Sequence, residues 1–204
     1  MKKHANAIKR GLRHPTTGLI WRRLKGRKRY IVIAAILLFL FVIFTDQVKA
    51  FIILAVFGIV SSTVTVYKRV VRMPPVFELV SLTTVMVTIF YGPVVGVIYT
   101  IVVNLASEVM SGYPDVMTLT YIPSRTIQAL FVWFAFAHGS MGIVSLGIWS
   151  NVIFNMVQQP IFMFLTDAEQ RLKALYFVIL NIPINILIFK TIGEPLYRLL
   201  EAIV

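Results

Sequence analysis

The side chains of this chain that could do chemistry inside an apolar setting are mainly carboxamides, with a few carboxylates. In one apolar run every fourth residue is small or polar, in the order Gly92, Gly96, Thr100, Asn104 and Glu108. Residues four apart advance by about 40° around a helix, so these five form a stripe along one side. We expect the two glycines to admit a neighbouring backbone, and Thr100 and Asn104 to hydrogen-bond across that contact. The ionisable Glu108 either extends to water or lines a cavity.

Two further apolar runs carry carboxamides at helical spacing, in each case beside a proline. They are Asn151, Asn155, Gln158 and Gln159 before Pro160, and Asn181 and Asn185 on either side of Pro183. A proline inside a helix frees a backbone carbonyl, which a nearby amide can satisfy. The same amides could instead line a polar cavity for a small ligand. The candidate ligand-binding residues are Asn104, Glu108, Asn151, Asn155, Gln158, Asn181 and Asn185.

Patterns typical of catalysis are weak. The chain has no cysteine and only three histidines, of which only His138 lies outside the first 14 residues, so no metal cluster is expected. It carries neither a glycine-rich phosphate loop with its lysine nor a nucleophile elbow. An enzyme built on Glu78, Glu108 and Asp115 is the weakest alternative, because nothing in the sequence fixes the geometry of these carboxylates. For Glu78, an ion pair with the nearby Arg72 is the simplest role. We predict a non-enzymatic chain that needs no cofactor.

The composition places these residues in a membrane. Hydrophobic residues make up 58% of the 204 residues, charged residues make up 14%, and the mean hydropathy is +0.85. Seven apolar runs separated by turn and charge signals predict helices, at residues 30–45, 48–67, 76–91, 93–111, 123–138, 142–165 and 172–192. Several runs are shorter than the roughly 20 residues of an untilted crossing. We therefore predict an all-α, polytopic transmembrane helical bundle of six or seven spans, with seven favoured.

The distribution of positive charge predicts the orientation of the bundle. With the N-terminus inside the cell and seven spans, seventeen of the twenty lysines and arginines fall on the cytoplasmic side. The C-terminus then lies outside. We expect a multi-pass protein of the cell membrane, with a basic cytoplasmic tail at 1–29 and a single transmembrane domain at 30–204.

The tail at 1–29 holds eleven of the basic residues and no acidic residue. We expect it to be amphipathic or partly disordered and to rest on anionic lipid headgroups, or else to dock a partner protein. Nucleic-acid binding is disfavoured, because base-stacking aromatics are nearly absent. The residues assigned to this membrane-surface or partner contact are Lys9, Arg10, Arg22, Arg23, Lys25, Arg27, Lys28 and Arg29.

A family resemblance joins several of these segments. An apolar helix, "FYGPVVGVIYTIVVNLASEVMSG", a loop, "PSRTIQALFVWF" and a final "NIPINILIFKTIGEPLYRLL" follow one another in the chain. This order resembles the substrate-binding S components of energy-coupling-factor vitamin transporters, over about residues 48–200. Those proteins are small bundles, usually of six helices. The resemblance implies that the bundle captures a vitamin-like molecule or a metal, while a separate coupling subunit and two ATPases supply the energy.

Two functions of different classes remain open. The chain is either a non-catalytic, small-solute-binding subunit of a transporter or a structural, accessory subunit of a larger membrane complex. The accessory role accounts for the basic tail and the small-residue stripe without any ligand. A small molecule that co-purifies with the protein distinguishes the first function from the second.

Overall fold

The computed structural model describes residues 30, 32–36, 38–39, 44–67, 76–112, 117–139 and 141–204. The chain divides into two units, Met1–Val48 and Lys49–Val204. In the first unit, residue 30 and residues 32–36 and 38–39 are helical, with exposed side chains. The tail at 1–29, with its eight assigned surface residues, lies outside the described residues.

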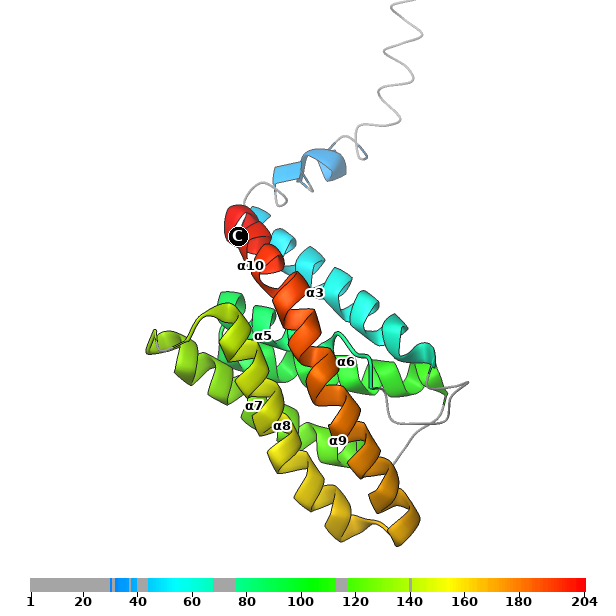
Figure 1. Ribbon diagram of the computed structural model, residues 1–204. Helices are drawn as coiled ribbons and strands as arrows, with labels where there is room; N and C mark the ends of the chain where they lie inside the picture. Colours follow the sequence, from blue (N-terminus) through cyan, green and yellow to red (C-terminus); the bar gives the residue numbers. More distant parts are fainter. Residues whose placement is uncertain are drawn as a thin grey trace, which may run out of the picture. The chain divides into compact units, whose positions relative to one another are not determined.

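Every regular element in the described ranges is helical, which confirms the all-α prediction for that part of the chain (Figure 1). The order is α3 (Thr45–Val64), a turn of 3-10 helix η1 (Thr65–Tyr67), α5 (Val80–Tyr91), α6 (Pro93–Ser111), α7 (Met117–Ala137), α8 (Ile143–Leu165), α9 (Ala168–Ile188), a π-helical segment η2 (Phe189–Gly193) and α10 (Glu194–Ile203).

Three helical stretches are long and apolar enough to cross a membrane: Thr45–Tyr67, Pro93–Ser111 and Ala168–Ile203. They support a membrane location for the protein. The helices α7 and α8 are as long, with 21 and 23 residues, but are not among the three. Their carboxamides, hydroxyls and Arg125 lower their mean hydropathy. The seven-span count therefore stays a prediction.

The last helix is longer than its apolar run. Hydropathy predicts a helix that ends at residue 192, whereas α9, η2 and α10 form one helix of 36 residues (Figure 1). At 1.5 Å per residue this helix is about 54 Å long, against about 30 Å for the hydrocarbon core of a bilayer. Asp167 precedes its first residue as the N-cap, and the Asp167 carboxylate accepts from the Gln170 N–H at 2.9 Å.

The turn between α5 and α6 depends on Gly92. Its φ of +87° lies in the left-handed region that favours glycine, and Pro93 follows at the first position of α6. A Cβ added to Gly92 would meet no atom within 4 Å. Gly92 therefore forms the turn and does not admit a neighbouring backbone, which corrects the packing role that its place in the stripe predicted.

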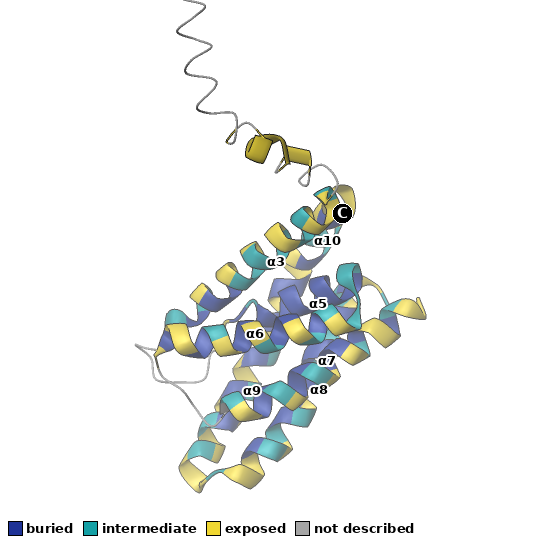
Figure 2. Cartoon of the chain, turned by 180° about the vertical axis from the view of Figure 1, so that it is seen from behind, coloured by how far each residue is buried: buried dark blue, intermediate teal, exposed yellow. Residues whose placement is uncertain are grey.

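The helix α5 occupies the centre of the second unit. Its residues from Val80 to Ile89 are all buried, and it contacts α6, α7, α8 and α9 (Figure 2). The largest apolar core joins α5 to α7, α8 and η2 through Met86, Val132, Leu146 and Phe189. Because α5 is surrounded, polar groups at its ends and on its faces must find partners on the neighbouring helices.

Candidate functional site

The centre of the candidate site is Arg125 of α7, whose side chain is fully buried. Its Nη2 donates to the carboxylate of Glu78, which lies just before α5 and is 2% exposed. Its Nη1 donates to Ser81 Oγ at 2.6 Å and to Gln128 Oε1 at 2.8 Å. The guanidinium carbon lies 3.8 Å from the centre of the Phe154 ring. Arg125 thus links α7 to the start of α5 through an ion pair and a hydrogen bond, and to α8 through a cation–π contact.

The ion pair differs from the pairing that the sequence suggests. We expected Glu78 to pair with Arg72, which lies outside the described residues. The structure pairs Glu78 with a buried Arg125. One sequence signal could have found it, because Arg125 is the only lysine or arginine between Arg72 and Arg171. An isolated basic residue in so long an apolar stretch indicates a paired, functional position.

Hydroxyls and amides extend the cluster from Arg125 to α8. The Ser81 hydroxyl accepts from Arg125 and donates to Glu78 Oε1 at 3.1 Å, and it lies 3.5 Å from Asn151 Oδ1. Gln128 Nε2 donates to Ser150 Oγ at 3.4 Å. The residues at the start of α5, together with α7 and α8, therefore contribute polar groups to one buried set.

The amides of α8 and α9 also meet. Asn155 Nδ2 donates to Asn181 Oδ1 at 3.3 Å, and Asn181 Nδ2 donates to the Val76 carbonyl at 3.2 Å. Asn155 also donates to the Asn151 carbonyl at 2.8 Å, and Asn185 donates to the Asn181 carbonyl at 3.0 Å. Four of the candidate ligand-binding residues are thus connected by hydrogen bonds, and all four are buried.

These bonds do not go to the carbonyls that the prolines free. A proline removes the bond to the carbonyl four residues earlier, which is that of Met156 for Pro160 and that of Ile179 for Pro183. Asn155 and Asn185 donate instead to the carbonyls of the residues one turn before them in their own helices. Backbone repair at the prolines therefore does not account for these two amides.

Several polar atoms of Arg125 and of the neighbouring amides make no hydrogen bond to any described residue. They are Arg125 Nε, Asn151 Nδ2, Asn155 Oδ1, Asn185 Oδ1 and both amide atoms of Gln158. An unpartnered buried polar group costs about 1–3 kcal/mol. Gln158 is fully buried, so its amide carries this cost at both ends. We refer to Arg125, Asn151, Asn155, Gln158, Asn181 and Asn185 together as the amide cluster.

The stripe on α6 is a separate contact with α5. A Cβ on Gly96 would clash with Thr88 Oγ1, so the two helices approach each other closely there. One turn on, Thr84 Oγ1 donates to Thr100 Oγ1 at 3.1 Å. Asn104 is buried, and its Nδ2 donates to the Thr100 carbonyl at 2.7 Å within α6.

Glu108 also belongs to this stripe and not to the amide cluster. Its side chain is 8% exposed near the C-terminal end of α6, where its carbonyl accepts from the Gly112 N–H at 3.1 Å. The hydrogen bonds given above for Thr100 and Asn104 run to α5 or stay within α6. The seven candidate ligand-binding residues thus divide between the α6 stripe and the helices around Arg125.

Comparison of the chain with protein-family models, with curated proteins and with solved structures gives no match.

Proposed function

We propose that the chain is the small-solute-binding subunit of a membrane transporter, and that the solute binds at the amide cluster. The observation that carries the proposal is the set of buried hydrogen-bonding atoms from α7, α8 and α9 that have no partner among the described residues. A bound molecule that bonds to these atoms would recover the free energy that their burial costs.

The chemistry of the unpartnered atoms favours an organic solute over a metal ion. Arg125 Nε and Asn151 Nδ2 are donors, whereas Asn155 Oδ1 and Asn185 Oδ1 are acceptors, and Gln158 offers one of each. A metal ion uses acceptors only. The charge of Arg125 is balanced by Glu78. The solute that fits is a neutral or dipolar molecule with both donors and acceptors, as a vitamin-like molecule has.

The transport role and its partners rest on the resemblance to the S components. In that role the chain binds the solute, and a separate coupling subunit with two ATPases drives its release into the cell. The chain has its N-terminus in the cytoplasm and crosses the cell membrane several times. The alternative, an accessory subunit of a larger complex, needs no solute, and the amide cluster then serves only internal packing.

The decisive variant is Gln158→Met. It keeps the length of the side chain and removes two buried atoms that make no bond to any described residue. Without solute we expect the variant to be as stable as the wild type, or more stable by up to about 3 kcal/mol. With solute it should lose the stabilisation that the wild type shows. This opposition between stability and binding is typical of a binding residue.

The measurement is thermal unfolding of the purified full chain in detergent, against a panel of vitamins and divalent metal salts. Asn155→Leu and Asn185→Leu should also lose the ligand-dependent shift in Tm. Asn104→Leu is the matched control, because Asn104 is a buried amide that also bonds to a carbonyl one turn earlier, but outside the cluster. It should keep the shift. If no compound raises the Tm of the wild type, the accessory role replaces this proposal.

A further inference from the structure

The helix α5 begins inside the bundle, beside the amide cluster. The hydroxyl of Ser81, in its first turn, lies 3.5 Å from Asn151 Oδ1 of α8. Along α8, Asn151 is about 12 Å from the first residue, Ile143, and about 21 Å from the last residue, Leu165, at 1.5 Å per residue. The N-terminus of α5 therefore lies far from both ends of α8.

The first turn of α5 is buried without a side-chain cap. Residues 80–82 are at most 2% exposed, and the N–H of Thr83 donates to the Leu79 carbonyl at 2.9 Å. The N–H groups that precede such a bond have no partner within the helix, so a buried helix end needs an acceptor from elsewhere. No described side chain caps α5, whereas Asp167 caps α9. A bound acceptor could take the place of a cap at α5.

Two side-chain donors without partners lie at the same end of α5. Arg125 Nη1 donates to Ser81 Oγ at 2.6 Å, and Arg125 Nε makes no bond to any described residue. Asn151 lies beside the same hydroxyl, and its Nδ2 likewise has no partner among the described residues. Both side chains are at most 1% exposed. Because backbone N–H, Nε and Nδ2 are all donors, this side of the amide cluster offers donors to a solute.

The acceptors without partners lie toward α9. They are Asn155 Oδ1 and Asn185 Oδ1. Asn155 is bonded to Asn181 of α9 at 3.3 Å, and Asn185 belongs to α9 itself. Along α8, Asn155 is about 6 Å from Asn151. The amide cluster therefore has a donor side at α5 and an acceptor side at α9, about one helical turn apart.

The donor side fits a carboxylate better than a carbonyl or a phosphate. A carbonyl oxygen has two lone pairs, whereas a carboxylate accepts at about four positions. A helix N-terminus acts as about half a positive charge, and Glu78 already balances Arg125. One added negative charge is thus largely offset, whereas the two charges of a phosphate monoester would leave a buried excess. In membrane transporters, helices that begin within the bilayer receive anionic substrate groups at their N-termini.

We infer that the solute carries a carboxylate, and that this carboxylate binds at the N-terminus of α5. The N–H groups of residues 80–82, Arg125 Nε and Asn151 Nδ2 donate to it. The donor end of the same molecule bonds to Asn155 and Asn185, so the solute extends along α8 from α5 toward α9. The inference rests on the proposed function and narrows the solute to dipolar carboxylates.

Asn151→Asp tests the inference without a solute, because it places a carboxylate of the chain itself at the donor side. The ligand-free variant should unfold at a higher Tm than the wild type, since its charge meets the donors that otherwise lack partners. Asn104→Asp is the matched control, because it makes the same change in a buried amide of α6 outside the amide cluster. It should lower the Tm, as a buried charge without such donors does. A Tm for Asn151→Asp at or below that of the wild type would overturn the inference.

Paired compounds test the same site from the side of the solute. At neutral pH, 4-aminobenzoate and pantothenate combine a carboxylate with donors, whereas 4-aminobenzamide and panthenol lack the carboxylate. In thermal unfolding of the full chain in detergent, only the acid of each pair should raise the Tm of the wild type. Asn151→Asp should show no shift, because its own carboxylate occupies the site. Equal shifts for both members of a pair would overturn the inference and leave the proposed function standing. If no compound shifts the Tm but Asn151→Asp is stabilised, the proposed function fails and the anion site at α5 stands.

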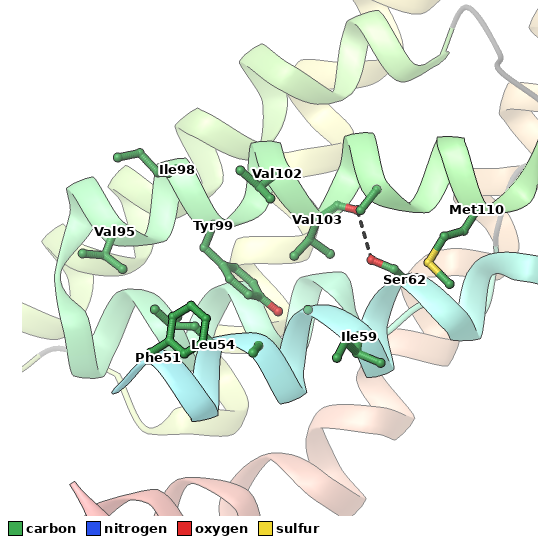
Figure 3. A pocket seen from close by; sticks show the side chains of 13 residues that line it. Phe51, Leu54, Ile59, Ser62, Val95, Ile98, Tyr99, Val102, Val103 and Met110 are labelled. Carbon is green, nitrogen blue, oxygen red and sulfur yellow. Dashed lines mark hydrogen bonds between the residues drawn. The ribbon is translucent and has the colours of Figure 1, made fainter. Parts of the chain in front are cut away.

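The pairs also distinguish this site from the apolar groove between α3 and α6. That groove has a volume of about 590 Å³ and is almost entirely apolar, with Phe51 and Leu54 on α3 and Val102 on α6 among its walls (Figure 3). Its Ser62 hydroxyl already donates to the Val103 carbonyl at 3.4 Å. An apolar groove favours the neutral member of each pair, because a carboxylate loses its hydration there. Larger shifts with the neutral members would therefore assign binding to the groove and overturn the inference.

Discussion

The ion pair between Glu78 and Arg125 gives the most quantitative prediction about this fold. Glu78→Gln changes little in shape but leaves the Arg125 charge without a counter-ion. The Arg125 side chain is fully buried, and among the described residues Ser81, Gln128 and the ring of Phe154 are the contacts that remain to stabilise its charge. Removing one partner of a buried pair typically costs about 3–5 kcal/mol. We expect the free energy of unfolding to fall by that amount.

The reverse change and the double change complete a thermodynamic cycle. Arg125→Met leaves the Glu78 carboxylate buried beside Ser81, and should also cost about 3–5 kcal/mol. The double variant Glu78→Gln/Arg125→Met removes both charges, and replacing a buried pair by neutral groups is often close to neutral. The two single losses should therefore exceed the double loss by at least about 3 kcal/mol.

The assay is equilibrium unfolding in mixed detergent micelles, followed by the fluorescence of Trp133 and Trp149. The control is Glu194→Gln, which breaks an exposed pair with Arg198 at 3.1 Å and should cost less than about 1 kcal/mol. If Glu78→Gln costs no more than this control, or if the two single losses add up to the double loss, the buried pair does not hold the helices together.

Three further results are expected. Gly96→Leu should lower the free energy of unfolding by about 1–3 kcal/mol or more, because the Cβ of the new side chain would meet Thr88. Circular dichroism on heating measures the loss, and an unchanged Tm would contradict the close contact between α5 and α6. Gly147→Ala should destabilise because its Cβ would lie 2.1 Å from the Phe189 ring, and Phe189→Leu should restore part of the loss in the same assay. A reporter fused after Val204 should be external if seven spans are correct, and a cytoplasmic reading would reject that count.

The sequence predicts best those features that depend on neighbours along the chain. Helical periodicity locates the helices, and the Gly92–Pro93 pair locates the turn between α5 and α6. The spacing of Asn151 and Asn155 also predicts that both amides share one side of α8, and both are buried there. Such features follow from the geometry of a single helix.

Features that depend on contacts between helices were not predictable in the same way. Glu78 and Arg125 are 47 positions apart, and nothing local to either residue indicates that α5 and α7 bring them together. The nearest basic residue in the sequence, Arg72, lies outside the described residues, so a pair between Arg72 and Glu78 stays a prediction. The length of the last helix was missed for a different reason, because hydropathy reports where a helix is apolar and not where it ends. Residues 194–203 continue the helix with a polar side.

The π-helical segment Phe189–Gly193 sets the rotational phase between α9 and α10. A π turn bonds back five residues and holds one residue more than an α turn, and one residue corresponds to about 100° of rotation. After it, the Tyr197 ring lies 5.4 Å from the Phe90 ring and 6.5 Å from the Phe136 ring, measured between centroids. With one residue fewer, Tyr197 would point about 100° away from both rings. The segment thus acts as an angular spacer, which lets one continuous helix present differently phased apolar faces to the same bundle.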